Sequence, residues 1–292
     1  MNILLLGKNG QVGWELQRSL SVLGRVTALG HDEADFTNPQ AVADTVRALR
    51  PEVIVNAAAH TGVDKAESEP GHARLLNATT PGLLAEEAAQ LGAWLVHYST
   101  DYVFDGSGSR PWLETDMPAP LSVYGATKLE GERLIQQSGC QHLILRTSWV
   151  YAARGGNFAK TMLRLAQERE RLTVIDDQWG APTGAELLAD VTAHAIRHLQ
   201  KQPQDGGLYH CVAGGETTWH SYAKYVLAHA GKAREAIKIK ATEVAPVPTS
   251  AFPTPAARPL NSRLDTRKLQ TTFGLALPDW QQGVARMLTE IL

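Results

Sequence analysis

The sequence predicts an α/β protein built on a parallel β-sheet that is wound on both faces. Short apolar runs of strand length alternate with amphipathic helical segments through the first half of the chain. A glycine-rich turn joins the first of these runs directly to a helical segment. Parallel neighbouring strands need a crossover connection, usually a helix, so this alternation favours a doubly wound parallel sheet.

Hydrophobic periodicity places the elements of the first half. The run 2–6 is short, apolar and ended by a glycine, as expected of a buried strand, and 11–20 has apolar residues at helical spacing. A proline at its start and apolar residues on one face predict a helix over 39–49. The other predicted strands are 25–29, 53–55, 93–98 and 142–146, and the other predicted helices are 70–91 and 124–137.

The pattern becomes looser after Trp149. Two apolar runs, 172–175 and 208–212, have strand character. The segment 245–260 carries five prolines and predicts a loop, because proline disrupts helix interiors and central strands. Helical spacing recurs over 158–169, 186–199, 219–229 and 279–291.

Composition and charge narrow the class of protein. Hydrophobic residues make up 43% and charged residues 20%, which is typical of a globular protein. A net charge of −2 and a pI of about 6.6 offer no basic field to a nucleic acid. Cys140 and Cys211 fit a reducing compartment, and no apolar run approaches membrane-spanning length. We expect a cytoplasmic protein with no nucleic-acid or membrane partner.

The turn after the first strand reads G-K-N-G-Q-V-G, with glycines at positions 7, 10 and 13. Glycines let a backbone turn sharply and approach a pyrophosphate, and a helix N-terminus offers free N–H groups. A strand-to-helix turn without a ligand is the alternative, but the position favours a Rossmann-type dinucleotide site. Residues 1–150 are thus predicted to form the dinucleotide-binding domain. Residues 151–292 would form mainly a smaller, interleaved substrate domain, with some segments returning to the first. The residues predicted for the cofactor from this turn are Gly7, Gly10 and Gly13.

The end of the second predicted strand leaves the choice of cofactor open. NAD is usually held there by an acid and NADP by an arginine, but this position is Gly30. Asp32, Glu33 or Arg25 are the nearby candidates. Asp35, followed by Phe36, is placed to touch the adenine end, or else is an acid at a helix N-terminus. Both NADPH and NADH therefore stay open.

Two further segments follow strands that end at the same edge of the predicted sheet. The stretch 56–61 (N-A-A-A-H-T) has small side chains that leave space for a ligand or else allow close helix packing. Ser99, Thr100 and Asp101 end the fourth strand. Both segments therefore belong to the predicted ligand crevice.

Tyr124 and Lys128 carry the predicted chemistry. Their spacing of four places both on one helix face, where an ammonium would stabilise a phenolate and lower the pKa of the tyrosine. Thr100 supplies a hydroxyl that can orient a substrate oxygen. These groups suit hydride transfer with proton transfer at a carbonyl or alcohol carbon. An exposed helix face is the alternative for Tyr124 and Lys128 alone, but the glycine turn argues against it.

The chain resembles the extended short-chain dehydrogenase/reductases and, among them, the family of dTDP-4-dehydrorhamnose reductases. The matching segments span nearly the whole chain: G-K-N-G-Q-V-G-W-E-L, V-N-A-A-A-H-T, V-D-K-A-E, H-Y-S-T-D-Y-V-F, Y-G-A-T-K, R-T-S-W-V-Y, G-A-P-T and R-P-L-N-S-R-L. The resemblance implies NAD(P)H-dependent reduction of the C4 ketone of dTDP-4-dehydro-β-L-rhamnose. It implies Tyr124 as proton donor, Lys128 as its partner and Thr100 as the carbonyl-orienting hydroxyl.

The resemblance also implies contacts with both ligands. Thr100, Asp101 and Trp149 would contact the dTDP-sugar. Further cofactor residues would be Gln11, Val12, Asp35, Phe36, Ala59, His60, Thr61, Tyr98, Tyr124 and Lys128.

A basic, polar loop near the C-terminus completes the predicted substrate site. Arg258 and Arg263 flank Asn261 and Ser262, and guanidinium groups pair with phosphate oxygens in fork geometry. Ordinary surface charge is the alternative. Arg258, Asn261 and Ser262 are the residues predicted to bind the nucleotide diphosphate.

Three acids form a further candidate site. Glu186 and Asp190 are four apart on a predicted helix, and Glu15 lies on the first helix. Solvated surface acids are the simplest interpretation. The resemblance implies a homodimer in which Mg²⁺ binds these acids, and oxygen ligands suit that ion.

Two other functions stay open from the sequence. An epimerase or dehydratase of the same fold would keep its cofactor bound and regenerate it in each cycle. A regulatory subunit would bind a dinucleotide and a partner protein without turnover. Net consumption of NAD(P)H distinguishes the reductase from both.

Overall fold

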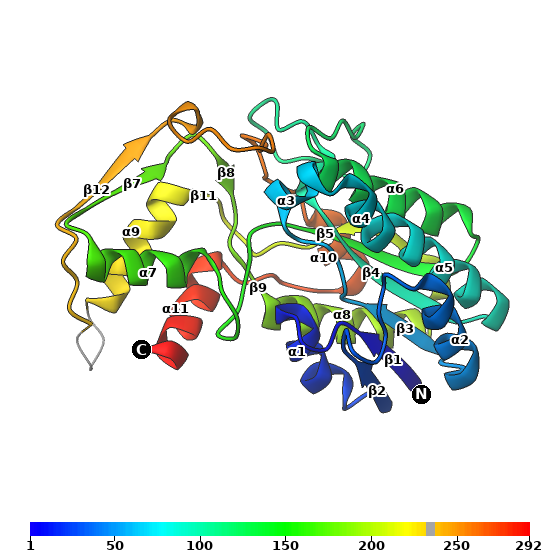
Figure 1. Cartoon of the computed structure of the whole chain (residues 1–292). Helices are drawn as coiled ribbons and strands as arrows, with labels where there is room; N and C mark the ends of the chain where they lie inside the picture. The colour runs from blue at the N-terminus through cyan, green and yellow to red at the C-terminus, as the bar shows by residue number, and fades with distance from the viewer. Residues whose placement is uncertain (232–236) are drawn as a thin grey trace.

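The core of the molecule is a six-stranded, fully parallel sheet in the order β10-β5-β4-β3-β1-β2. The computed structural model describes residues 1–231 and 237–292 (Figure 1). The strand order reverses between β1 and β3, and ligands of such sheets bind at this switch point. The strands are β1 (Asn2–Leu6), β2 (Arg25–Leu29), β3 (Val53–Asn56), β4 (Trp94–Thr100), β5 (Gln141–Thr147) and β10 (Gly207–His210).

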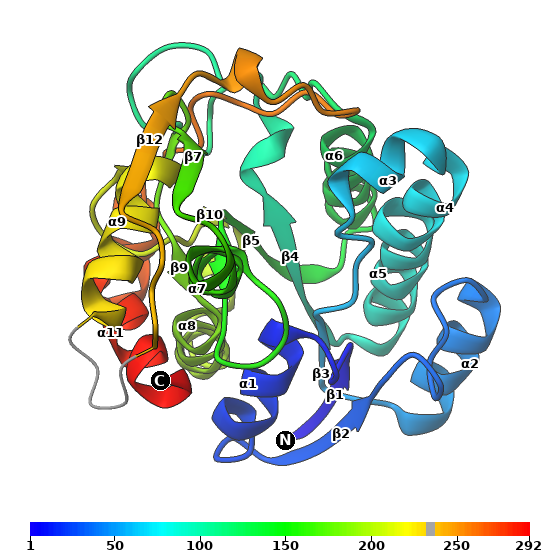
Figure 2. The same cartoon turned by 60° about the vertical axis from the view of Figure 1, so that its left-hand side comes forward.

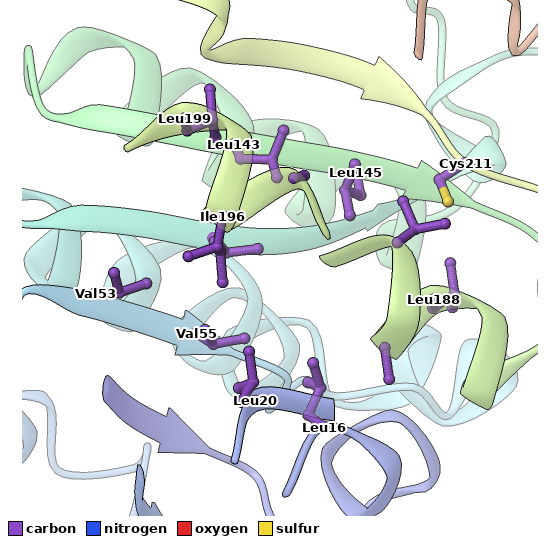
Figure 3. Close-up of a cluster of buried hydrophobic side chains, with 14 of the residues drawn as sticks. Leu16, Leu20, Val53, Val55, Leu143, Leu145, Leu188, Ile196, Leu199 and Cys211 are labelled. Carbon is purple, nitrogen blue, oxygen red and sulfur yellow. The ribbon is translucent and has the colours of Figure 1, made fainter. Parts of the chain in front are cut away.

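Strand alternation builds a hydrophobic layer on each face of the sheet. On β1, Ile3 and Leu5 pack towards α1 (Gln11–Leu20), α8 (Ala185–Leu199) and α10 (Arg267–Phe273), as Figure 3 shows for the surrounding cluster. Leu4 and Leu6 point to the opposite face. That face is covered by α2 (Pro39–Leu49), α5 (Thr80–Leu91) and α6 (Val123–Gln137), as Figure 2 shows. The doubly wound parallel sheet predicted from the sequence is therefore confirmed.

The helix predicted over 70–91 is present with those bounds, and it contains a π-helical turn that the sequence did not predict. It is divided into α4 (Pro70–Arg74), a π-helical turn η1 (Leu75–Thr79) and α5. The buried Asn77 of this turn accepts a hydrogen bond from the His60 N–H and donates to the His60 carbonyl. The extra residue of a π-helical turn changes the direction of a side chain. Neither this turn nor α3 (Val63–Ser68), which precedes α4, shows a clear hydrophobic periodicity in the sequence.

The C-terminal lobe packs three helices around a second core. These are α7 (Phe158–Glu168), α9 (Trp219–Ala230) and α11 (Trp280–Ile291). The predicted loop over 245–260 begins within an edge strand, β12 (Glu243–Val247), which pairs in parallel with β7 (Arg171–Ile175). Pro246 is tolerated because this sheet has only two strands and both are edges.

Segments from the second half of the chain complete the first lobe. Strand β10 extends the central sheet beside β5, and α8 and α10 cover one of its faces. Within the described part of the chain, none of the helices has the length and apolar character needed to cross a membrane.

Candidate active site

The glycine turn between β1 and α1 leaves no room for a side chain at Gly7 or at Gly13. A Cβ on Gly13 would lie 2.0 Å from the Gly7 carbonyl oxygen, and one on Gly7 would lie 2.7 Å from the Ala58 nitrogen. Gly7 also has a φ of +88°, which favours glycine. No side chain caps the N-terminus of α1 at Gly10, so its N–H groups are free for an anion. This cradle fits a pyrophosphate.

The carboxylate of Glu33 lies at the end of β2, beside Gly30, which has no side chain. The Gly30 N–H donates to a carboxylate oxygen of Glu33 at 2.8 Å, and Lys8 forms an ion pair with the same carboxylate at 2.6 Å. A carboxylate and an ammonium thus lie together where a dinucleotide presents its adenosine ribose. Of the three candidates considered from the sequence, the structure places Glu33 at this position.

The segment after β3 runs directly beneath the glycine turn. Ala58 approaches Gly7, and the neighbouring His60 is buried with an Nδ1 atom that has no hydrogen-bond partner. Burial is the main cause that lowers the pKa of His60. Ala59 is half-buried and Thr61 exposed, so this segment presents small and polar groups to the crevice.

Asp35 and Phe36 lie beside the predicted cofactor region, but their contacts in the structure are with other parts of the protein. The Asp35 carboxylate accepts hydrogen bonds from the N–H and hydroxyl of Thr37. Phe36 is buried in the core under the sheet, and its carbonyl accepts from Thr80. Their contact with a cofactor stays a prediction.

The three predicted catalytic residues come together at the carboxyl end of β4. Thr100 ends that strand, and its hydroxyl lies close enough to Tyr124 to influence its pKa. Tyr124 stands in the first turn of α6, with its ring edge-on to Tyr102 at 5.5 Å between centroids. Lys128 lies one turn further along α6 and is 2% exposed.

The electrostatics of this group differ from the expectation. Burial raises the pKa of Tyr124 to about 12, and the Thr100 hydroxyl offsets this only in part. The expected lowering by Lys128 is absent because the Lys128 Nζ donates to the Tyr98 carbonyl at 2.6 Å and contacts His97 Nε2 at 3.1 Å. Burial lowers the pKa of Lys128 to about 8. Tyr124 is therefore protonated at neutral pH.

Tyr98 contributes its backbone rather than its ring to this group. Its hydroxyl pairs with Thr192 of α8 at 2.6 Å, on the other face of the sheet. Burial raises the pKa of this phenol.

Asp101 joins the catalytic group to the C-terminal loop. It is 2% exposed, and burial raises its pKa to about 6, with contacts to Ser262 and Thr100 acting in the opposite direction. One of its carboxylate oxygens has no hydrogen-bond partner. Ser262 is itself buried, so the structure brings these two predicted substrate residues together.

Arg258 and Asn261 are engaged by the protein. Arg258 forms a bidentate ion pair with Asp64 of α3, at 3.2 and 2.7 Å. The Asn261 amide donates to the carbonyls of Ser107 and Arg110 and accepts from Arg263. Asn261 therefore fastens two loops to each other, and phosphate binding by Arg258 requires exchange of its partner.

Trp149 has a strained backbone at the end of β5. Its φ of +48° is unusual for a bulky residue, and its ring stacks on Trp219 with 3.6 Å between centroids. A Cβ on Gly180 would lie 2.7 Å from the indole, so the glycine makes room for it. Backbone strain of this kind is concentrated at functional sites, and the contact of Trp149 with the sugar stays a prediction.

The three candidate metal ligands do not form a cation cage within one chain. Arg18 pairs with Asp190 at 2.9 Å and lies 3.6 Å from Glu15, so its guanidinium already balances both carboxylates. Burial raises the pKa of Glu186. No group of three or more His, Cys, Asp or Glu side chains among residues 1–231 and 237–292 is arranged to hold a metal.

Sequence reasoning did not single out several polar groups of the site. Thr147, the last residue of β5, and Ser148, which follows it, have buried hydroxyls without hydrogen-bond partners. His97 and Asn56 form a buried chain to Lys128. A polar residue within an otherwise apolar buried strand is the signal that marks His97.

The parallel sheet, the glycine cradle and the Thr100, Tyr124 and Lys128 group define an extended short-chain dehydrogenase/reductase. Comparison with known proteins identifies the branch. The family model described as "RmlD substrate binding domain" matches residues 1–292. A dTDP-4-dehydrorhamnose reductase of Shigella flexneri is 62% identical over 100% of this chain and 98% of its own, and that of Escherichia coli K12 is 61% identical with the same coverage. The chain belongs to the dTDP-4-dehydrorhamnose reductase family.

Solved structures agree with this assignment. The dTDP-4-dehydrorhamnose reductase of Bacillus anthracis, in complex with NADP, has a TM-score of 0.88 and 34% identity, covering 99% of both chains. A UDP-glucose 4-epimerase of Thermus thermophilus, in complex with NAD, has a TM-score of 0.79 at 21% identity, covering 100% of both chains. The epimerase therefore shares the fold alone.

Proposed function

We propose that this protein reduces the C4 ketone of dTDP-4-dehydro-β-L-rhamnose to dTDP-L-rhamnose with NAD(P)H, the last step of dTDP-rhamnose biosynthesis. The full-length relatives above 60% identity carry the assignment, because they are all named for this reaction. The bound NADP of the Bacillus anthracis relative supports the cofactor. The chain's own geometry supports the chemistry, as follows.

The glycine turn and the N-terminus of α1 would hold the cofactor pyrophosphate, with Glu33 and Lys8 at the adenosine ribose. NAD(P)H supplies a hydride to the carbonyl carbon when bound. A ketone becomes an alcohol only if its oxygen also gains a proton. Tyr124 fits this role because its raised pKa keeps the phenol protonated at neutral pH.

Thr100 and Lys128 complete the proton path. The Thr100 hydroxyl, next to Tyr124, would donate to the same ketone oxygen and orient it, in exchange for its hydrogen bond to Asp101 Oδ1. Proton donation leaves a phenolate on Tyr124, which a nearby ammonium stabilises. Burial lowers the pKa of Lys128 to about 8, so both its ammonium and its amine forms are populated near neutral pH.

The decisive experiment measures net cofactor consumption. Purified protein is mixed with dTDP-4-dehydrorhamnose and either NADH or NADPH, and absorbance of the reduced cofactor is followed. Stoichiometric loss of absorbance with formation of dTDP-rhamnose is expected. Sugar conversion without net cofactor loss would indicate an epimerase or dehydratase, and absence of any conversion a binding subunit.

The proposal extends to a cytoplasmic homodimer. Mg²⁺ belongs to the proposal only as an ion bound between the two copies. Because Arg18 neutralises Glu15 and Asp190 within one chain, a Mg²⁺ site would need carboxylates from two copies. Sedimentation velocity with and without EDTA tests this. A dimer that is unchanged by the chelator, with unchanged activity, removes Mg²⁺ from the proposal.

A further inference from the structure

The partner of Lys128 in the structure is His97, a residue that the proposed reaction does not yet use. His97 lies in the middle of β4 and is 1% exposed. Its two ring nitrogens contact different residues. Nδ1 lies 3.1 Å from the Asn56 Nδ2 at the end of β3, and Nε2 lies 3.1 Å from the Lys128 Nζ.

A backbone N–H determines the orientation of Asn56. The Ala58 N–H donates to the Asn56 Oδ1 at 3.0 Å, and a backbone N–H can only donate. Rotating the amide by half a turn would bring two donors together. The amide nitrogen of Asn56 therefore faces His97 and donates to it, so Nδ1 of His97 is an acceptor without a proton.

The proton of His97 is then located on the opposite ring nitrogen. Burial is the main cause that holds the pKa of His97 well below its usual value, so the ring is neutral and has a single N–H. With Nδ1 accepting, that N–H is on Nε2 and points at the Lys128 Nζ. An N–H donor needs a lone pair opposite it, which the amine form of lysine has and the ammonium form lacks.

We propose that His97 is a positioning residue that, fixed by Asn56, donates its Nε2–H to the Lys128 amine and thereby favours the neutral amine in the substrate-free enzyme. The proposal rests on the proposed function for its catalytic meaning, because the proton state of Lys128 matters through Tyr124. If Lys128 is protonated, an N–H of its ammonium faces the Nε2–H of His97, and both groups are donors. If the His97 proton moves to Nδ1 instead, it faces the amide N–H of Asn56, which is also a donor.

The other titratable and polar groups around Lys128 already have hydrogen-bond partners. Glu132, one turn further along α6, favours the ammonium, but it accepts from Arg146 of β5 and from Ser99 of β4. Asp101, in the short helix η2 (Asp101–Val103), contacts Thr100 and Ser262. On η1, Asn77 bonds His60 and Thr127. Among these groups, His97 is the one that donates towards Nζ.

The first experiment determines the tautomer of His97 in the wild-type protein. NMR of protein labelled with ¹⁵N-histidine distinguishes the two ring nitrogens, and the His97 signals are assigned by their loss in His97→Gln. The proposal expects Nε2 protonated and Nδ1 unprotonated throughout the neutral pH range. A protonated Nδ1, or an imidazolium ring, overturns it.

The second experiment uses Asn56→Asp to reverse the direction of the hydrogen bonds that lead from Asn56 through His97 to Lys128. The carboxylate keeps the bond from the Ala58 N–H but can only accept from His97, so the His97 proton should move to Nδ1 and Nε2 should accept from a Lys128 ammonium. The pKa of Lys128, titrated through its side-chain NMR shifts, is expected to rise by about one unit or more. The alkaline limb of the kcat/KM profile should move with it.

A matched control makes the same substitution at an exposed helix cap. Asn38 caps α2 by accepting from the Ala41 N–H, which an aspartate does equally well. Asn38→Asp should leave the His97 tautomer and the Lys128 titration unchanged. A tautomer switch in Asn56→Asp without a change in the Lys128 pKa contradicts the proposal.

The NMR measurements need no substrate, so they separate this proposal from the proposed function. If the wild type fails to reduce dTDP-4-dehydrorhamnose, the function is wrong while the tautomer and the lysine titration still decide the role of His97. If Asn56→Asp does not fold, the wild-type tautomer decides alone.

Discussion

Two regions of the site use their polar side chains in opposite ways. The sheet edge, formed by the carboxyl ends of β1, β3, β4 and β5, leaves polar atoms without protein partners, among them one oxygen of Asp101 and the Nδ1 of His60. The clamp loop, residues 254–263, pairs its polar side chains with protein. Arg258 is held by Asp64, and Asn261 by two backbone carbonyls.

The difference indicates that the sheet edge binds ligands and carries the chemistry, whereas the clamp loop holds distant segments together. A buried polar atom without a partner costs free energy unless a ligand satisfies it, so the sheet edge is prepared to bind. The pairs of the clamp loop join segments that lie far apart in the sequence and so hold the loop against the first lobe. Loss of a group from the edge should affect turnover, whereas loss from the clamp loop should affect mainly local order.

The largest expected effect is at the sheet edge, in Tyr124→Phe. Loss of the proton donor should lower kcat by about 10²- to 10⁴-fold. The ring itself is retained against Tyr102, so the Kd for the cofactor should change little. Stopped-flow kinetics and cofactor titration measure the two quantities. Turnover close to that of the wild type would reject Tyr124 as the donor.

A pair of charge neutralisations compares the stability of the two regions. Glu132 and Arg146 form an ion pair under the sheet edge with side chains only 2% and 3% exposed. Glu132→Gln leaves a buried guanidinium without its counter-charge and should lower the free energy of unfolding by about 3–5 kcal/mol. In the clamp loop, Asp64→Asn disrupts a pair whose side chains are 41% and 25% exposed, at a cost of about 1 kcal/mol or less. Equal losses in urea unfolding would contradict the comparison.

The pH dependence of stability tests the link between the two regions. Folding raises the pKa of Asp101 from 3.8 to about 6, so folding favours its protonated form. That contribution is complete below the unfolded pKa and is lost as pH rises through the folded one. Asp101→Asn should therefore raise the free energy of unfolding at neutral pH, by at most about 3 kcal/mol. The gain should vanish in acid, and a gain that is independent of pH in urea unfolding would refute the assignment.

The smallest effect concerns the choice of cofactor at the sheet edge. Lys8→Gln removes an ammonium that can pair with a 2′-phosphate and should weaken NADPH binding about tenfold, with NADH little affected. Glu33→Gln removes the acceptor for ribose hydroxyls and should weaken NADH instead. Calorimetric Kd values for both cofactors measure the ratio. Parallel changes for both cofactors would place the adenosine ribose elsewhere.

Sequence alone determined what depends on local periodicity. Alternating apolar residues determined the strands of the central sheet, and the glycine spacing determined the turn before α1. Tyr124 and Lys128 share a helix face because they are four residues apart. Periodicity also predicted the helix over 70–91, but not its π-turn, whose Asn77 bonds to His60 of another segment.

Tertiary structure alone decided which polar groups meet and in which proton state. Packing brings His97 of β4 against Lys128 of α6, Ser262 against Asp101, and Arg258 against Asp64, 194 residues away. The pKa of Tyr124 rises instead of falling because burial raises it and Lys128 contacts the Tyr98 carbonyl and His97 instead. Burial and long-range contacts arise only when distant segments pack, and no local pattern in the chain encodes them.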